Sequence, residues 1–391
     1  MAKIATDAPL RILQLNSLLT GGGTDDQCLK LSRGLMDLGQ DVWLAAPGDR
    51  ELSEAARDLG LRLVSTGREG ALKIGFIRSA ARACRDLAID IVHGHHGRDI
   101  WPTILAAGHS GTRPKVVLTR HLAKSPSSWI SRRFLLSRCD LLIAVSMFVE
   151  RVLKEGVYEP GSPVEERRAR PPLRGDLSKI RVVHGGIDPG RFRPMPDAGA
   201  SLRAEWGLKA GDVAFGVVGG YDRPRGKGQR EFLEAAAGIA SEAPRARFLI
   251  IGRGNLEGVL NEDIRRLGLE GRAWLTPYCR DMPAAMNALD CLVHPQVATD
   301  AFPTVILEAM ACDRPIVATR CDGAPEQFGD GVHGYVVPME DARALGTAMR
   351  RLAVDDALRR EMGGRGRGHV LAHFTLDRLA ERVLAAYRDL W

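Results

Sequence analysis

The stretch CLVHPQVATDAFPTVILEAMACDRPIVATRCDGAPEQFGDGVHGYVV, residues 291–337, decides the fold class. It predicts short aliphatic strands at Cys291–His294, Ile316–Thr319 and Tyr335–Val337, with a helix at Thr304–Cys312 after the first strand. Runs that are apolar throughout indicate strands buried on both faces. Such strands, separated by helices, are typical of a parallel sheet in an α/β domain.

The same alternation fills the rest of the chain. In the second half, it predicts strands at Val213–Val218, Arg247–Ile251 and Ala273–Leu275 and helices at Glu231–Ile239, Leu256–Leu267 and Pro283–Leu289. In the first half, it predicts strands at Arg11–Leu15, Val42–Ala46, Leu61–Val64, Ile89–Val92, Val116–Thr119, Leu141–Val145 and Ile180–His184 and helices at Asp25–Leu38, Lys73–Leu87 and Met147–Lys154. The fold class is therefore α/β, with two Rossmann-like, doubly wound parallel-sheet domains.

Composition agrees with this interpretation. The chain has 391 residues, of which 45% are hydrophobic and 26% charged, as in ordinary globular proteins and unlike disordered, collagen-like or membrane-spanning ones. Its seven cysteines show no C-x-x-C spacing, which favours a reducing compartment. The N-terminal residues lack the pattern of an export signal. We therefore expect a cytoplasmic protein.

The net charge of +7 is unevenly distributed. Residues 1–190 carry 28 basic and 21 acidic side chains, whereas residues 191–391 carry 27 of each. The segment Ile100–Cys139 has no acidic residue. Its basic residues are Arg113, Lys115, Arg120, Lys124, Arg132, Arg133 and Arg138. Two explanations are possible. The basic residues bind an anionic partner, or they are the solvated surface residues of helices in a chain that is rich in arginine.

Two further segments lie outside the repeating pattern. Tyr158–Asp176 is rich in proline and charge, so we expect an exposed insertion at about residues 157–177. At the C-terminus, apolar residues recur at helical spacing and form a stripe that requires a partner surface. These residues are Leu376, Leu379, Val383, Leu384 and Tyr387.

Parallel sheets bind ligands beyond the carboxyl ends of their strands. Three loops there carry suitable chemistry. Asn16–Asp26 contains three consecutive glycines, which allow backbone amides to approach a phosphate, although they also suit a tight turn. The loop 218–228, VGGYDRPRGKG, carries cations suited to a diphosphate, although a solvated basic turn would have the same composition. In the third loop, Asp300 and Glu308 flank a helix start and can accept hydrogen bonds from hydroxyls.

The third loop resembles the E-G-F-P-x-x-x-L-E-A-M-A-x-G-x-P-V-V-A…G-x-x-E signature of the retaining GT-B glycosyltransferases of family 4. The likeness also includes VVHGGIDPGRF (182–192), the 218–228 loop and FTLDRLAER (374–382). It implies an acceptor-binding domain at 1–190 and a nucleotide-sugar-binding domain at 191–371, facing across a crevice. A crossover helix at 372–391 would return to the first domain.

The resemblance also assigns roles to individual residues. Glu308 is expected to hold the ribose, Asp300 to meet the donor sugar, Lys227 to bind phosphate and His121 to lie near the reacting carbon. Asp300 stands where the family has Glu, and Gly220 where it has Arg, so Arg223 or Arg225 is the candidate substitute. The remaining donor-site candidates are Gly22, Gly23, Arg225, Arg253, Phe302, Pro303, Thr304 and Val305.

The implied activity is retaining transfer of a sugar from a nucleotide-diphosphate sugar to an acceptor hydroxyl, without a bound metal or other cofactor. The acceptor would be a glycan or lipid-linked glycan, as in polysaccharide or lipopolysaccharide assembly, and no nucleic acid is expected.

The acceptor-side basic patch would be Arg120, Lys124, Arg132, Arg133 and Arg138, with peripheral contact to an anionic inner membrane surface as a hypothesis. We favour lining or structural roles over metal binding for His93, His95 and His96. Alternatives are a non-catalytic GT-B binding protein and a nucleotide-sugar epimerase.

Overall fold

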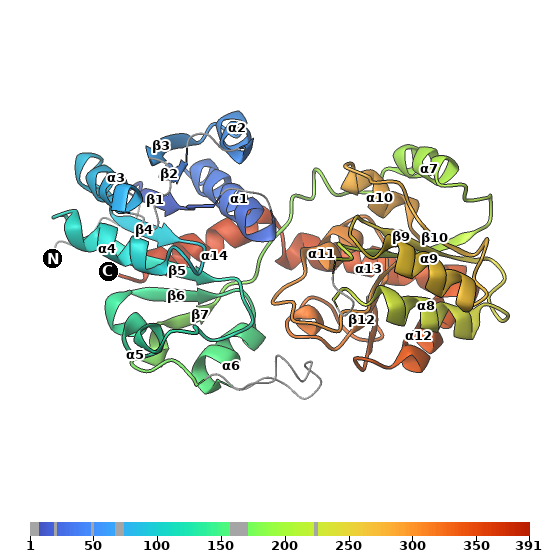
Figure 1. The fold of residues 1–391 in the computed structure, drawn as a ribbon. Helices are drawn as coiled ribbons and strands as arrows, with labels where there is room; N and C mark the ends of the chain where they lie inside the picture. The colour runs from blue at the N-terminus through green and yellow to red at the C-terminus, as the bar shows by residue number, and fades with distance from the viewer. Residues whose placement is uncertain (1–7, 19–21, 48–50, 67–73, 157–170, 223–225) are drawn as a thin grey trace. The chain divides into compact units, whose positions relative to one another are not determined.

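The computed structural model describes residues 8–18, 22–47, 51–66, 74–156, 171–222 and 226–391. These residues form two compact units (Figure 1). Unit 1 contains the described residues up to 156, then 171–186 and 376–391, and unit 2 contains 187–375. The sequence placed the domain divisions four residues later in the first case, at 190/191, and four residues earlier in the second, at 371/372.

Unit 1 is built on a seven-stranded parallel sheet with the order β3-β2-β1-β4-β5-β6-β7 among its described residues. The strands are β1 (Arg11–Leu15), β2 (Asp41–Pro47), β3 (Arg62–Thr66), β4 (Ile91–Gly94), β5 (Lys115–Arg120), β6 (Leu141–Ala144) and β7 (Ile180–Val182). The chain moves outward from β1 to β3 and then resumes at β4 on the other side of β1. The connections therefore reverse direction between β1 and β4, and ligands bind open α/β sheets at such points.

The helices of unit 1 follow these strands. They are α1 (Gly23–Asp37), α2 (Glu51–Asp58), α3 (Ile74–Asp86), α4 (Ile100–His109), α5 (Trp129–Arg138), α6 (Met147–Glu155), the 3₁₀ turn η1 (Leu177–Lys179) and α14 (Leu376–Arg388). Serine side chains cap two of them: Ser128 accepts from the Ser131 amide at α5, and Ser146 from the Val149 amide at α6.

The C-terminal helix α14 packs on α1 within unit 1 (Figure 1). Its apolar stripe is buried with residues of α1 and of the sheet, for example Val383 with Leu35 and Ile12. Gly34 allows the close approach, because a Cβ there would lie 2.9 Å from the Ala380 Cβ. Helix α1 and the sheet of unit 1 thus supply the surface that the amphipathic sequence of this helix requires.

Unit 2 has a six-stranded parallel sheet with the order β10-β9-β8-β11-β12-β13 among its described residues. The strands are β8 (Val213–Val218), β9 (Ala246–Ile251), β10 (Ala273–Leu275), β11 (Cys291–His294), β12 (Ile316–Thr319) and β13 (Gly334–Val337). The helices are α7 (Pro196–Glu205), α8 (Gln229–Ile239), α9 (Glu257–Arg266), α10 (Met282–Ala288), α11 (Thr304–Ala311), α12 (Ala342–Val354), α13 (Asp356–His373) and the 3₁₀ turn η2 (Ala324–Glu326). Here the direction of the connections reverses between β8 and β11.

Both faces of this sheet are covered by helices. Neighbouring residues of one strand face opposite sides, so Ile250 packs with Phe232 and Met349, from α8 and α12. Its neighbour Leu249 packs with Met310 and Val370, from α11 and α13. Strands buried on both sides must be apolar throughout, which explains the unbroken aliphatic runs of the sequence.

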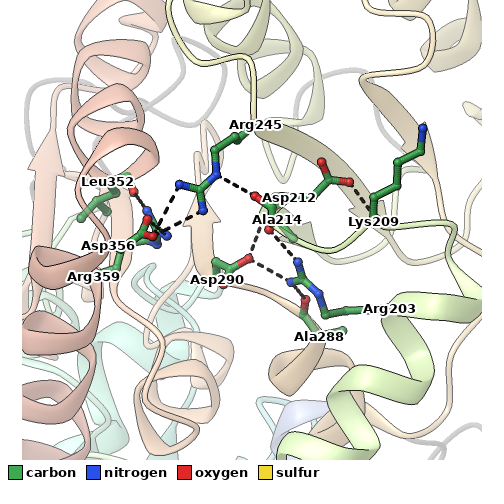
Figure 2. Close-up of polar contacts among 11 residues, drawn as sticks. Arg203, Lys209, Asp212, Ala214, Arg245, Ala288, Asp290, Leu352, Asp356 and Arg359 are labelled. Atoms are coloured by element: carbon green, nitrogen blue, oxygen red, sulfur yellow. Dashed lines mark hydrogen bonds and ion pairs between the residues drawn. The ribbon is translucent and has the colours of Figure 1, made fainter.

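Charged residues surround the amino ends of β8 and β11 (Figure 2). Arg203 donates to the carbonyl of Ala288 at 2.8 Å and to the carboxylate of Asp290 at 2.9 Å. The same Asp290 oxygen accepts from the Ala214 amide at 2.8 Å, at the start of β8. Arg245 contacts Asp356 at 3.4 Å. These pairs tie helices α7 and α13 to the first residues of the strands.

The structure confirms the predicted α/β class with two parallel sheets. Helices α2, α4, α5 and α7 were not predicted. Helix α4, IWPTILAAGH, is apolar with little polar face, and α5 exposes Trp129, Ile130 and Phe134 among its charges. Neither has the periodic stripe on which helix prediction depends.

The described end of the expected exposed insertion, residues 171–177, is mostly exposed, with Leu173 as the exception. Residues 157–170 lie outside the described residues. After them, Leu173 is only 3% exposed and its amide donates to the Leu153 carbonyl at 2.8 Å. The Arg174 amide likewise donates to the Arg132 carbonyl at 2.8 Å. This segment lacks periodicity, yet it packs because its apolar residue and backbone amides find partners on α5 and α6. In the described part of the chain, no helix is long and apolar enough to cross a membrane.

Candidate functional site

An ion pair joins two loops at the carboxyl edge of the unit 2 sheet. Lys227 Nζ lies 2.6 Å from Asp300 Oδ2, and the two side chains are 35% and 17% exposed. Lys227 follows β8 and Asp300 follows β11, the adjacent strands at which the connections reverse direction. The sequence predicted both residues as site residues, and the structure brings them into contact at the edge where ligands bind.

Glycines hold the Lys227 loop against the β11 loop. Gly228 has a positive φ of 78°, and a side chain there would overlap the carbonyl of Pro295. Gly219 leaves room for the lysine stem, because a Cβ would lie 2.9 Å from Lys227 Cγ. The Val297 amide also donates to the Gly226 carbonyl at 3.2 Å. The glycines of this loop thus allow a close approach of the backbone to the β11 loop and of the lysine stem to β8.

Asp300 is fixed through its backbone and precedes a helix start. Its amide donates to the carboxylate of Asp322 at 2.9 Å. Helix α11 begins at Thr304 after Pro303, with no side-chain cap. The first amides of a helix lack intrahelical partners and favour an anion. Glu308, half-buried, is the fifth residue of α11.

A buried histidine lies behind the ion pair, and the sequence assigned it no role. His294, the last residue of β11, is 2% exposed, and its Nε2 lies 3.8 Å from Asp300 Oδ2 without a hydrogen bond. Burial lowers the pKa of His294 to about 4, so the ring is neutral at pH 7. Nearby Gln296 also buries an unbonded Oε1. Buried polar atoms without partners are rare in proteins and often mark functional positions.

The other donor-site candidates of unit 2 are spread along the same edge. Arg253 is exposed, follows β9 and places its guanidinium 4.9 Å from the centre of the Tyr278 ring. Phe302 packs against Phe374 with ring centroids 6.1 Å apart. Val305, in the first turn of α11, is half-buried. Arg223 and Arg225 lie outside the described residues.

The carboxyl edge of the unit 1 sheet carries a second polar cluster, made of two buried histidines, two half-buried ones and their partners. His121, directly after β5, buries an unbonded Nε2, and His95, directly after β4, buries an unbonded Nδ1. Burial lowers the pKa of His121 to about 3 and that of His95 well below its usual range. The two ring centroids are 6.1 Å apart. At neutral pH this edge therefore offers uncharged imidazoles.

The remaining histidines of this cluster are hydrogen-bonded to protein groups. His93 bonds the Tyr387 hydroxyl at 2.6 Å and the Thr119 hydroxyl at 2.7 Å, which attaches α14 to two strands of the sheet. His96 bonds Asp25 at 2.6 Å. Gly22 and Gly23 stand at the start of α1, where, apart from the adjoining residues and the helix backbone, no atom of the described residues lies within 4 Å of a Cβ placed on either glycine. The structure thus gives His93 a structural contact, in line with the favoured interpretation.

The predicted basic patch is smaller in the structure than in the sequence. Arg120 is only 7% exposed and donates to the carbonyl of Lys124 at 2.7 Å, so its charge is not available on the surface. Arg132 donates to the carbonyls of Pro126 and Ser127. Lys124, Arg133 and Arg138 are exposed. A single sequence cannot separate such buried, carbonyl-bound arginines from exposed ones.

Comparison with known proteins identifies relatives for both halves of the chain. Residues 21–165 match the family described as Glycosyltransferase Family 4, and residues 212–355 match Glycosyl transferases group 1. The D-inositol 3-phosphate glycosyltransferase of Corynebacterium jeikeium is 30% identical over 339 residues, which cover 81% of this chain and 76% of that one. Two other curated relatives, EpsD of Bacillus subtilis and the D-inositol 3-phosphate glycosyltransferase of Segniliparus rotundus, are matched over about half of their own length.

Solved structures share the fold over nearly the whole chain. A glycosyltransferase from Rickettsia africae has a TM-score of 0.81 at 19% identity, covering 98% of both chains. Anabaena HepE in complex with UDP and glucose has a TM-score of 0.75 at 18% identity, covering 96% of this chain and 98% of that one. These likenesses support the two-domain parallel-sheet architecture expected from the sequence.

Proposed function

The chain belongs to glycosyltransferase family 4, and from this premise we propose that it transfers a sugar from a nucleoside-diphosphate sugar to an acceptor hydroxyl. The observation that carries the proposal is the Lys227–Asp300 pair at the carboxyl edge of β8 and β11. It places a cation and a hydroxyl acceptor side by side near an uncapped helix start. A nucleoside-diphosphate sugar offers a diphosphate and hydroxyls to such a site.

The proposed chemistry assigns each group a part. Lys227 and the first amides of α11 bind the diphosphate and stabilise the negative charge that develops on the leaving group. Asp300 accepts from the transferred sugar and Glu308 from the ribose, as the family resemblance implies. The same resemblance assigns His121 to the reacting carbon, and burial lowers its pKa so that the imidazole is neutral.

The transfer is proposed to retain the configuration of the anomeric carbon and to need no metal. In this route the acceptor hydroxyl attacks from the face of the leaving group, and the departing phosphate helps to take its proton. No side chain of this chain is assigned as a nucleophile. Side-chain cations and helix amides can supply the charge stabilisation that a metal gives in other enzymes.

The acceptor is proposed to be a glycan or lipid-linked glycan, reached at an anionic membrane surface. The support is the surface around α5, where Trp129 is 63% exposed beside Ile130 and Phe134. A cavity of about 380 Å³ opens there, lined by Trp129, Arg132, Arg133, Phe134, Pro171, Pro172 and Arg174. Exposed aromatic side chains together with arginines suit the interface of an anionic bilayer.

Vesicle co-sedimentation tests this contact. Binding should require anionic lipid, weaken as salt increases, and fall when Arg133 and Arg138 are both replaced by Ser. Arg132 is left unchanged because it donates to backbone carbonyls. Replacing the exposed Arg265 and Arg360 of unit 2 by Ser is the matched control. Equal recovery on neutral and anionic vesicles would leave an acceptor in solution as the better interpretation.

The main experiment is a panel of nucleotide sugars, scored first by thermal shift. Donors that bind are then assayed for release of nucleoside diphosphate with and without glycan acceptors, and the anomeric configuration of the product is read by NMR. Transfer with retention supports the proposal. Binding without turnover would favour the non-catalytic alternative, and conversion of the sugar without an acceptor would favour an epimerase.

A further inference from the structure

Two side chains lie near the same carboxylate oxygen of Asp300. Its Oδ2 lies 2.6 Å from Lys227 Nζ and 3.8 Å from His294 Nε2. The first distance is a charge-assisted hydrogen bond, and the second is too long for any hydrogen bond. In this structure, Lys227 therefore holds the carboxylate and His294 stands about one ångström too far away to bond it.

Binding of a diphosphate disturbs this arrangement. The amine that would bind the phosphates is the one that neutralises Asp300, so each new contact to phosphate weakens the existing pair. A half-buried carboxylate without a partner is costly, because it has lost water without gaining a donor. Whenever the diphosphate binds before the sugar hydroxyls reach Asp300, or without a sugar, the carboxylate therefore needs a second donor.

We propose that His294 is a positioning residue that takes over the Asp300 carboxylate when Lys227 turns to the diphosphate of the donor. This inference rests on the proposed function. The His294 ring is placed for this part: it is buried, its Nε2 has no hydrogen bond, and it faces the oxygen that Lys227 would release. A small rotation of the Asp300 side chain brings the two atoms within hydrogen-bonding distance.

The backbone on both sides of the Asp300–His294 pair is fixed by hydrogen bonds. A rotation of the Asp300 side chain is therefore the simplest movement available. The Asp300 amide is bonded to Asp322, and His294 lies in β11 in register with Ala318 of β12. The Lys227 loop is attached to Val297 through Gly226. Asp300 also carries a shorter side chain than the glutamate that the resembled family has. The shorter side chain suits a site in which the second donor, His294, stands at the end of β11.

The test measures the affinity of the nucleoside diphosphate that the panel identifies, using the full chain and no sugar. His294→Leu removes the second donor, so Asp300 retains Lys227 more strongly and the dissociation constant should rise about tenfold, as expected for one hydrogen bond to a charged group. His294→Gln keeps an N–H donor at similar reach and should stay within about threefold of the wild type. His333→Gln, at a half-buried histidine elsewhere in unit 2, is the control and should bind as the wild type does.

A double-mutant cycle separates the proposed change of partner at Asp300 from a purely structural role of His294. In an Asp300→Ala background there is no carboxylate to take over, so adding His294→Leu should change the dissociation constant by less than about twofold. An equal loss of nucleoside-diphosphate affinity in both backgrounds, or no loss in either, overturns the proposed replacement of Lys227 by His294 at Asp300. If the leucine variant does not fold, as judged by its melting temperature, His294→Asn is used instead, because its shorter amide does not reach Asp300. A wild type that binds no nucleoside diphosphate overturns the proposed function, whereas binding without coupling overturns only the exchange.

Discussion

At the amino edge of the unit 2 sheet, Arg203 and Arg245 bond backbone carbonyls and the carboxylates of Asp290 and Asp356 (Figure 2). At the carboxyl edge of the same sheet, Lys227 has one carboxylate partner, and His294 nearby buries a nitrogen with no partner. Both edges are made of the same strands and both carry charge. They differ in how their cations are held: Arg203 and Arg245 each bond a backbone carbonyl and a carboxylate, whereas Lys227 is paired with Asp300 beside a histidine whose Nε2 is unbonded, although Arg314 at the amino edge also buries an unbonded Nε.

This difference separates a structural role from a ligand-binding one. A guanidinium shared between carbonyls and carboxylates fixes the start of a strand, because its planar donors match several acceptors at once. A buried side chain with unused hydrogen-bonding capacity requires an explanation, and a bound ligand is one of them. Unit 1 has the same feature at its carboxyl edge, where His95 and His121 each bury an unbonded nitrogen.

The largest effect is expected from removing the charges of the carboxyl edge. Lys227→Ala and Glu308→Ala should each lower turnover at least 100-fold, since each loses a charged contact worth about 3 kcal/mol in the transition state. The melting temperature of Lys227→Ala should fall only slightly, because Lys227 is 35% exposed, although the 17%-exposed Asp300 loses its partner. Lys209→Ala, an exposed lysine at the amino edge, is the matched control. Normal turnover in both site variants would refute the assignment of the donor site.

The converse change at the amino edge should affect stability and leave the chemistry intact. Asp290→Ala leaves the Ala214 amide and Arg203 without their carboxylate, so the free energy of unfolding should fall by about 2 kcal/mol. Urea denaturation measures this loss, and the activity of the folded fraction should equal that of the wild type. A selective loss of activity at full stability would mean that the two edges are not separate in function.

Acid should destabilise the carboxyl edges through their buried histidines. The folded pKa is about 3 for His121 and about 4 for His294, below the 6.5 of an unfolded histidine. The unfolded state therefore binds more protons below pH 6.5, and the free energy of unfolding falls as pH decreases, by about 2 kcal/mol per histidine at pH 5. His121→Gln and His294→Gln should each flatten this dependence between pH 6.5 and 5. The exposed His109→Gln should leave the slope unchanged, and a flat wild-type profile would contradict the prediction.

The smallest effect is expected from a chelator. If Lys227 and the α11 amides stabilise the leaving group, EDTA should leave the rate of transfer unchanged. The comparison is made on the same preparation before and after dialysis against EDTA. A loss of activity that magnesium or manganese restores would show that the carboxyl edge works through a metal and would require another assignment for Asp300.

The sequence anticipated part of the site and missed another part. Lys227 and Asp300 stand in loops whose motifs could be recognised, and their contact follows from the adjacency of β8 and β11. His294 was visible as a polar residue at the end of an apolar strand, but only its burial and the distance to Asp300 give it a role. Arg120 is the opposite case. The sequence places its charge in the predicted basic patch, but the side chain is buried and does not contribute to the surface.

By itself, the sequence determined the alternation of strands and helices, the two parallel sheets and the family, because these depend on periodicity and local motifs that lie within short stretches of chain. Only the tertiary structure decided which polar groups satisfy one another. Asp290 meets Arg203 and Ala214 from distant positions, and His93 meets Tyr387 across almost 300 residues. Burial and hydrogen-bond partners arise when separate elements pack together, so no local pattern can state them in advance.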